Sequence, residues 1–146
     1  MNLSLSPVTL EDAEDLVMLR IAAMRESLER IGRFDQARAR ERFLANFTPE
    51  YTRHIELDGI KTGFVVVKPF ETGLLLDHLY IRPDFQGRGL GSRVLETVFM
   101  EADEKGLAIR VGALKGSDSN RFYQRHGFKL VEQADWDNYY LRPARV

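Results

Sequence analysis

Hydrophobic positions recur along the chain with two different periods, one typical of helices and one of strands. From Ala13 to Leu28 the apolar residues follow the 3.6-residue period of a helix, with acidic residues on the opposite face. A short helix is expected after Ser117 or Ser119 and before Gly127, because serine favours a helix start and glycine a helix end. The longer predicted helices span about residues 10–28, 35–46 and 89–105. The last of them is expected to bury a stripe formed by Leu90, Val94, Leu95, Val98 and Ala102.

Strands are predicted where apolar residues alternate with polar ones or form short runs between turn residues. Residues 64–67 and 74–76 are continuously apolar, which is typical of strands covered on both faces. Asp58-Gly59 is a strong signal for a hairpin turn, and Pro69–Gly73 marks a second turn. The predicted strands span residues 2–6, 51–57, 60–68, 74–82, 108–114, 128–132 and 138–141.

The order of these elements indicates an α/β fold. One strand–helix–strand unit, residues 74–114, predicts a parallel pair of strands joined by a right-handed crossover. The hairpins on either side predict antiparallel pairs. We therefore expect a single domain over residues 1–146, with a mixed, mostly antiparallel central sheet, one parallel pair and helices on both faces.

Composition narrows the class of protein. Hydrophobic residues make up 44% of the chain, which is ordinary for a globular domain. No cysteine is present, and this absence excludes a disulfide scaffold, a thiol nucleophile and a thiolate zinc site. The net charge of −1 provides no global field for nucleic acid or an anionic membrane, so neither is an expected partner. No signal peptide and no membrane-spanning run are visible, and we expect a cytoplasmic protein.

The segment from Gln86 to Gly91 carries the clearest candidate chemistry. It reads Gln-Gly-Arg-Gly-Leu-Gly, follows a predicted strand and opens a predicted helix. Glycines allow backbone N–H groups to approach a ligand, and a helix start attracts phosphate. A Walker loop would need a lysine that is absent here, and the mid-chain position after a hairpin argues against a dinucleotide fingerprint. The segment therefore predicts a phosphate cradle of another kind.

These residues resemble the GNAT superfamily of acetyl-CoA-dependent N-acetyltransferases. The phosphate loop of that family reads Gln/Arg-x-x-Gly-x-Gly/Ala, which Gln86, Gly89 and Gly91 match. The lead-in Leu79–Pro83 resembles the strand and proline that precede the loop, and Phe122–Phe128 resembles a second family motif, an aromatic pair followed by Gly-Phe. The resemblance covers essentially the whole chain and includes the order of its elements.

The resemblance implies that acetyl-CoA is the co-substrate and that no covalent enzyme intermediate forms. The pyrophosphate would lie on the glycine turn and the pantetheine arm beside the strand at Leu79–Ile81. Gly116 stands where the family often carries an asparagine, so Ser117 and Asn120 are both candidates for the pantetheine contact. The cofactor-binding residues that we expect are Leu79, Tyr80, Ile81, Gln86, Gly87, Arg88, Gly89, Leu90, Gly91, Ser92, Asn120 and Tyr123.

Acetyl transfer to an amine also requires that protons be moved. An alkylamine with a pKa of about 10.4 is neutral roughly once in 2,500 molecules at pH 7, a penalty of about 4.6 kcal/mol. Asp77 and His78 interrupt an apolar strand beside the implied acetyl site, so either residue or an ordered water is a candidate base. The alternatives are an ion pair for Asp77 and a core histidine for His78. Tyr123 would hydrogen-bond the departing thiolate, or would only pack.

The acceptor amine remains open at this level. Residues 20–42 hold seven arginines against four acids, which could select an acceptor with a carboxylate or could be an ordinary solvated helix face. His54 and His126 show no ligand spacing, and no metal is expected. The leading hypothesis is an N-acetyltransferase acting on a small-molecule or protein amine, with a homodimer left open. The competing hypothesis is a non-catalytic acyl-CoA-binding or regulatory module on the same fold.

Overall fold

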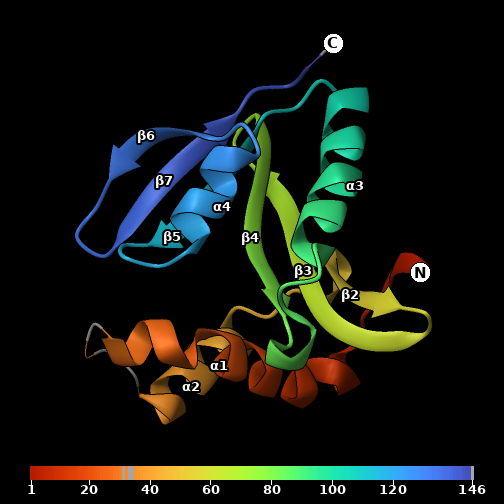
Figure 1. Cartoon of the computed structure of the whole chain (residues 1–146), viewed down its shortest axis with the longest axis vertical. Coiled ribbons are helices and arrows are strands. Elements are labelled where there is room, and N and C mark those ends of the chain that lie inside the picture. The colour runs from red at the N-terminus through yellow and green to blue at the C-terminus, as the bar shows by residue number, and fades with distance from the viewer. Residues whose placement is uncertain (31, 33–34, 146) are drawn as a thin grey trace. The chain divides into compact units, whose positions relative to one another are not determined.

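The computed structural model describes residues 1–30, 32 and 35–145, with the side chains of residues 26–28 left out. The side chain of Leu28, where the predicted apolar period of the first helix ends, therefore lies outside the described residues. Figure 1 shows the course of the chain. The α-helices are α1 (Ala13–Arg30), α2 (Gln36–Ala45), α3 (Leu90–Glu104) and α4 (Ser119–Arg125). The strands are β1 (Leu3–Pro7), β2 (Thr52–Leu57), β3 (Ile60–Phe70), β4 (Gly73–Ile81), β5 (Ile109–Leu114), β6 (Lys129–Gln133) and β7 (Asp137–Arg142).

Hydrogen bonds join seven strands of the described residues in the order β1-β2-β3-β4-β5-β7-β6. The β4–β5 pair is parallel, with Leu74 opposite Ile109, whereas β1–β2, β2–β3, β5–β7 and β6–β7 are antiparallel. The predicted mixed sheet with a parallel pair is confirmed. The chain divides into two compact units, Met1–Val66 with His78–Gly91 and Val67–Asp77 with Ser92–Val146. Both β3 and β4 contribute to both units, and the prediction of one domain stays a prediction.

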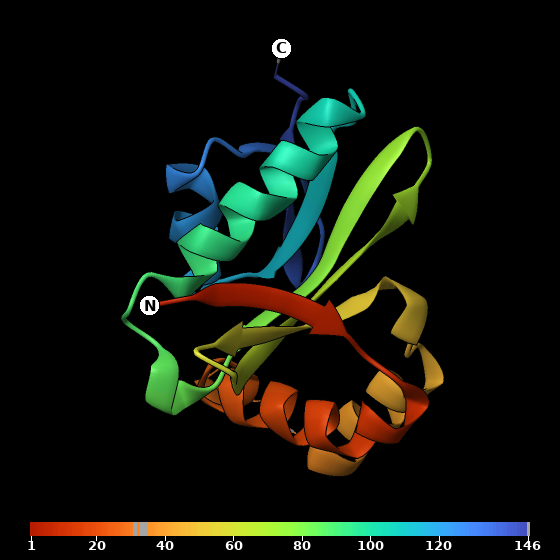
Figure 2. The same ribbon diagram turned by 90° about the vertical axis from the view of Figure 1, so that its right-hand side faces the viewer.

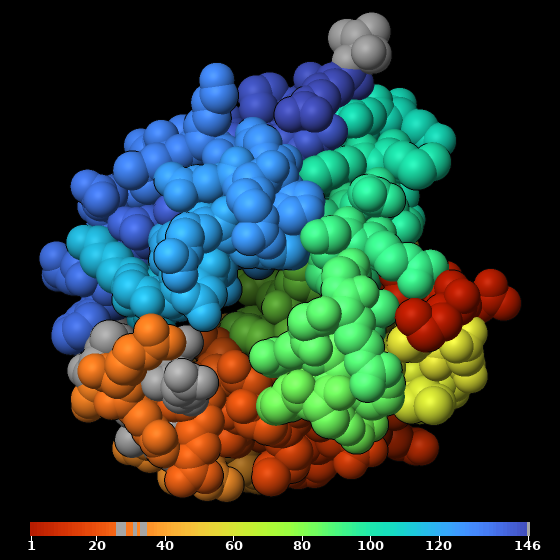
Figure 3. Space-filling view, in the orientation of Figure 1, coloured from red at the N-terminus to blue at the C-terminus, as the bar shows by residue number. Residues whose placement is uncertain are grey.

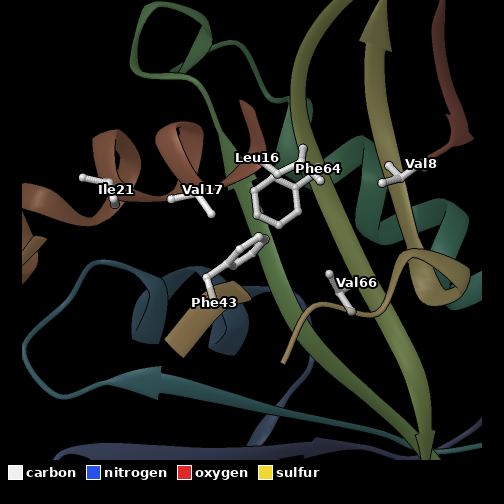
Figure 4. Packing of buried hydrophobic residues seen from close by; sticks show 7 residues of the cluster. All are labelled: Val8, Leu16, Val17, Ile21, Phe43, Phe64 and Val66. Atoms are coloured by element: carbon white, nitrogen blue, oxygen red, sulfur yellow. The ribbon is translucent and has the colours of Figure 1, made fainter. Parts of the chain in front are cut away.

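The core of the first unit lies between its two long helices and its strands. Figure 2 shows α1 and α2 side by side below β1 and β2. Figure 4 shows the rings of Phe43 from α2 and Phe64 from β3 next to each other, and their centroids are 5.7 Å apart in an edge-on contact. Leu16, Val17 and Ile21 complete the buried stripe of α1 that the helical period predicts.

The core of the second unit is formed where α3 and α4 meet the ring of Phe128. The Phe128 centroid lies 5.7 Å from that of Phe99 on α3 and 5.4 Å from that of Tyr123 on α4. The predicted buried stripe of α3 is confirmed, because five of its apolar residues are 0–2% exposed. These residues are Leu90, Val94, Leu95, Val98 and Ala102.

Two predicted boundaries are wrong. Pro69 was expected in a turn, but β3 runs through it to Phe70. The ladder between β2 and β3 ends at Val66, so no N–H is needed on that side where the proline stands. Neither Ser117 nor Ser119 is the residue before α4, since Asp118 takes that position. No helix in the described part of the chain is long and apolar enough to cross a membrane.

Candidate active site

The turn between β4 and α3 adopts a backbone conformation that only glycine accommodates easily. Gly87 has a φ of 79° and Gly89 a φ of 74°, both in the left-handed region. A Cβ atom added at either position would meet nothing within 4 Å. Open space rather than crowding surrounds these glycines, so conformation and not packing accounts for their identity.

The turn is held in place by contacts with the residues just before it. Gln86 Nε2 donates to the carbonyl oxygen of Ile81 at 3.0 Å, which ties the turn to the end of β4. Two guanidinium groups lie over the ring of Phe85. The Cζ atom of Arg82 is 5.2 Å and that of Arg88 is 4.9 Å from the ring centroid. Residues 86–89 are exposed, and Figure 3 shows this light-green segment at the surface. The turn is therefore ordered by its own side chains and faces solvent.

The helix α3 begins directly after the turn. Its first N–H groups have no partner within the helix, and its dipole places partial positive charge there. The first turn of α3 carries no acidic residue that would compete for this charge. Leu90, which is 2% exposed, anchors the first turn in the core, while Gly91 and Ser92 are partly exposed. The arrangement suits an anion, and phosphate in particular.

The end of β4 offers an extended backbone beside this turn. Its ladder with β5 covers Leu74–Leu76, so residues 79–81 continue beyond the last parallel pair. On the other side β3 lies very close. A Cβ on Gly63 would lie 2.1 Å from the Tyr80 carbonyl oxygen, and Arg82 N–H donates to the Thr62 carbonyl at 2.7 Å. The Leu79–Ile81 backbone thus extends past the β5 ladder, where an extended ligand could add to the strand.

His78 and Tyr80 are partly buried residues of β4 in the first unit. The His78 ring centroid lies 5.7 Å from that of Phe43 and 5.5 Å from that of Tyr80. The Tyr80 hydroxyl donates to Met24 Sδ at 2.9 Å, so the end of β4 is joined to α1. His78 therefore stands in an aromatic cluster, which agrees with its interpretation as a core histidine and leaves a role as base untested.

Asp77 belongs to the second unit and is paired. Its carboxylate lies 3.0 Å from Lys68 Nζ, and both side chains are partly exposed. The structure therefore contains an ion pair at Asp77, which is one of the two interpretations given from the sequence. The same carboxylate remains a candidate base, because a surface pair of this kind is weak, of the order of 0–1 kcal/mol.

Asn120 at the start of α4 is engaged on all sides by the protein. Its Nδ2 donates to the carbonyl oxygens of Leu114 and Ser117, each at 2.9 Å. Its Oδ1 accepts from Asn138 Nδ2 at 2.9 Å and from the Tyr140 hydroxyl at 2.8 Å. Two donors and two acceptors use the capacity of the amide. Sequence reasoning missed this role, because residues 18 and 20 positions further along the chain complete it.

Tyr123 is buried in α4, with 6% of its surface exposed. Its ring contacts Phe122 at 5.3 Å and Phe128 at 5.4 Å between centroids, both edge-on. The aromatic pair and the following Gly-Phe of the motif thus form one packed cluster in the second unit. The residues predicted for the glycine turn and the strand before it lie together in the first unit, from His78 to Gly91.

Metal ligands are a separate question. Among the described residues no three or more His, Cys, Asp or Glu side chains gather in a group that could hold an ion. His126 Nδ1 instead lies 2.8 Å from the Phe122 carbonyl oxygen, and His54 Nε2 lies 3.2 Å from Asp12 Oδ2. The prediction of no metal stays a prediction.

Comparison with known proteins places the chain in a family. Residues 50–130 match the model of the acetyltransferase (GNAT) domain, which is more than half of the chain. The chain therefore belongs to the GNAT acetyltransferase family. A search of curated proteins found no match.

Solved structures share the fold at low sequence identity. The PaiA N-acetyltransferase of Thermoplasma acidophilum, solved in complex with coenzyme A, has a TM-score of 0.80 at 17% identity, covering 98% of this chain and 99% of its own. An acetyltransferase of Thermus thermophilus has a TM-score of 0.75 at 24% identity, with 98% and 97% covered. The ribosomal-protein-S18-alanine N-acetyltransferase of Escherichia coli has a TM-score of 0.75 at 16% identity, with 99% and 96% covered. At these identities the likeness shows the fold alone.

Proposed function

We propose that this protein transfers the acetyl group of acetyl-CoA directly to a primary amine. The observation that carries the proposal is the open glycine turn at the start of α3. Its two left-handed glycines leave backbone N–H groups exposed at a helix start, which suits phosphate binding. The chain also belongs to the GNAT family, to whose phosphate loop this turn corresponds. Membership of the GNAT family supports acetyl-CoA as the donor.

In this proposal the chain's own backbone holds the donor. The N–H groups of residues 87–92 bind the pyrophosphate, and the exposed Arg88 adds a charged contact to a phosphate. The pantetheine arm lies along Leu79–Ile81, where β4 has passed its last pair with β5. Ser117 is the freer of the two candidates near the start of α4, because the Asn120 amide is occupied by protein groups.

The reaction is an attack of the amine nitrogen on the thioester carbonyl. A C–N bond forms, the carbonyl becomes a tetrahedral oxyanion, and the C–S bond then breaks to release the CoA thiolate. The N–H of Leu79 stabilises the oxyanion. Asp77, His78 or a water takes the ammonium proton, and Tyr123 donates a hydrogen bond to the departing sulfur. The pH profiles of Asp77→Asn and His78→Gln decide between the bases, since replacing the true base removes the acidic limb of the profile, where the rate falls as the base is protonated.

The first test measures binding of acetyl-CoA by calorimetry with a matched pair of variants. Gly89→Val and Gly106→Val place the same side chain at similar φ values, 74° and 68°, with nothing within 4 Å of either Cβ. The strain cost is therefore similar, but only Gly89 lies in the cradle. We expect micromolar-scale binding that Gly89→Val weakens at least about 10-fold and Gly106→Val leaves unchanged. Equal losses in both variants would remove the cradle assignment.

The second test follows free thiol release with a panel of amines. Turnover with any polyamine, amino acid, aminoglycoside or peptide supports transfer. Tight acetyl-CoA binding without turnover across the panel would favour the competing role as an acyl-CoA-binding or regulatory module. Absence of binding by the folded protein would end both.

A further inference from the structure

Arg20 on α1 is a guanidinium held against the aromatic cluster of the first unit without an anion. Its Cζ lies 5.8 Å from the centroid of the Tyr80 ring. The Nε atom is closed off from solvent and has no hydrogen-bond partner in the described structure. The residue as a whole is only partly buried.

This state is costly for an arginine. A guanidinium carries five N–H donors, and a buried donor without an acceptor loses its hydration with nothing in return. The neighbouring Tyr80 hydroxyl donates to Met24 Sδ and does not accept from the Arg20 Nε–H group, which has no hydrogen-bond partner. An oxyanion beside Arg20 would satisfy the donors.

Two other arginines of the same region are ion-paired, unlike Arg20. Arg25 pairs with Glu29 at 2.8 Å on the exposed face of α1, and Arg40 pairs with Glu14. Both of those carboxylates are therefore occupied, and no ion pair joins Arg20 to any acid of the described residues. Arg33 and the side chain of Glu26, which are counted among the arginines and the acids of residues 20–42, lie outside the described part.

The position of Arg20 relates it to the proposed chemistry. Tyr80 follows Leu79 directly on β4, and the proposed function places the acetyl carbonyl at the N–H of Leu79. A group held by Arg20 over the Tyr80 ring would therefore lie within a short spacer of an amine attacking that carbonyl. The guanidinium fork matches a carboxylate in two parallel hydrogen bonds.

We infer that Arg20 binds the carboxylate of the acceptor, so that the acceptor is a small primary amine carrying a carboxylate a few atoms from its nitrogen. This inference rests on the proposed function for the location of the acetyl group. It converts the general positive charge of residues 20–42 into one named binding residue. The charge of the other arginines then has no part in selecting the acceptor.

The test compares each acid with its neutral isostere. The acceptors are 3-aminopropanoate, 4-aminobutanoate and 5-aminopentanoate, each beside the corresponding amide, and thiol release is measured. For at least one length we expect kcat/KM to favour the acid by about 10- to 100-fold, the range for a hydrogen bond to a charged group. Arg20→Met, which keeps the length of the side chain, should abolish this preference, and Arg20→Lys should retain part of it.

The matched control is Arg25→Met, which removes the same charge from the same helix and should leave the preference unchanged. Equal rates for acid and amide in the unmodified protein, or a preference that survives Arg20→Met, would overturn the inference. A preference of more than tenfold for 3-aminopropylphosphonate over every carboxylate would replace the carboxylate by a phosphate-type anion and overturn it equally.

A binding measurement separates this inference from the proposed function. The NMR signal of the Arg20 Nε–H group is identified by its loss in Arg20→Met. In the presence of CoA, adding 4-aminobutanoate should shift it, and an unchanged signal up to tens of millimolar would contradict the inference even if amines are acetylated. If acetyl-CoA itself does not bind, the proposed function fails, while the shift still reports on Arg20.

Discussion

Two of the turns that connect a strand to a helix, the one before α3 and the one before α4, differ in how their polar groups are used. The turn from β4 to α3 contains Gly87 and Gly89 in the left-handed region, and its residues face solvent. The turn from β5 to α4 contains Gly116 with a φ of 82°, also with open space around it. In the second turn, however, the Asn120 amide binds the carbonyl oxygens of Leu114 and Ser117 and is itself bound by two side chains of β7.

The comparison shows that left-handed glycines by themselves do not mark a binding site. Both turns have them, and both precede a helix. What differs is whether the hydrogen-bonding groups of the turn are satisfied within the protein, as at Asn120, or stand open before a helix start, as at residues 87–90. We therefore propose ligand binding at the first turn, whereas in the second turn the Asn120 amide has a structural role.

The largest effect that sharpens this comparison is expected for Asn120→Ala. Removing the amide leaves two carbonyl groups and the Tyr140 hydroxyl without their partner. The free energy of unfolding, measured by urea titration, should fall by about 2–4 kcal/mol. The acetyl-CoA affinity of the folded fraction should stay within about threefold.

A matched control is Asn138→Ala, which removes only one of these four contacts and should cost about 1 kcal/mol. The comparison breaks if Asn120→Ala leaves stability unchanged but weakens acetyl-CoA binding tenfold. That result would restore Asn120 as the cofactor contact predicted from the sequence.

The second effect concerns Tyr123 on α4, the helix that follows the turn from β5. Its substitution tests whether this helix takes part in the reaction. Tyr123→Phe removes one oxygen and keeps the ring between Phe122 and Phe128. If the hydroxyl supports the leaving thiolate, kcat should fall by about 10²-fold with little change in acetyl-CoA affinity. A change of less than twofold would make Tyr123 a packing residue, and the chemistry would then fall to other groups.

The smallest effect concerns the far end of α3, opposite the open turn. Arg142, which is 2% exposed, donates to both carboxylate oxygens of Asp103 at 2.9 and 3.0 Å, and the Arg145 N–H adds a third bond. The hydrogen bonds from Arg142 and then Arg145 lower the pKa of Asp103 to about 2. This carboxylate therefore stabilises the fold above its unfolded pKa of about 3.9, and the contribution is lost as the pH falls toward 2.

The difference in unfolding free energy between the unmodified protein and Asp103→Asn should consequently be constant at neutral pH and shrink between about pH 4 and 2. Acid titration of both proteins by circular dichroism measures it. Acetyl-CoA binding at pH 7 should be the same in both proteins, since Asp103 and its partners Arg142 and Arg145 lie at the end of α3 that is far from the glycine turn. A difference that persists unchanged to pH 2 would contradict the assignment.

Local patterns predicted much of this fold. The helical period identified α3 and its buried residues, and Asp58-Gly59 identified the hairpin whose turn has φ values of 51° and 83°. These features depend on neighbours within a few positions. The glycine turn was also identifiable, because its signal is the order of a strand, glycines and a helix start within one short stretch.

The rest depends on contacts between distant residues. From the sequence alone Pro69 indicates a turn. Only the register shows that the pairing of β3 with β2 ends at Val66, so that β3 can continue through the proline. Asn120 stays a predicted cofactor contact, but the hydrogen bonds that its oxygen accepts from Asn138 and Tyr140 could not be predicted from the sequence. Arg20 was one of seven arginines in a charged segment, and its buried Nε without a hydrogen-bond partner, beside the Tyr80 ring, distinguishes it from the other described arginines of that segment.

The strand order β5-β7-β6 has a consequence for how the protein is made. The strand β7 is the last of the described strands to leave the ribosome, yet it pairs on one side with β5 and on the other with β6. Until residues 137–142 have been synthesised, β5 lacks its antiparallel neighbour and β6 has no strand to join. The second unit therefore completes its sheet only after β7 has left the ribosome, and the edges of β5 and β6 that β7 covers stay open in the nascent chain until then.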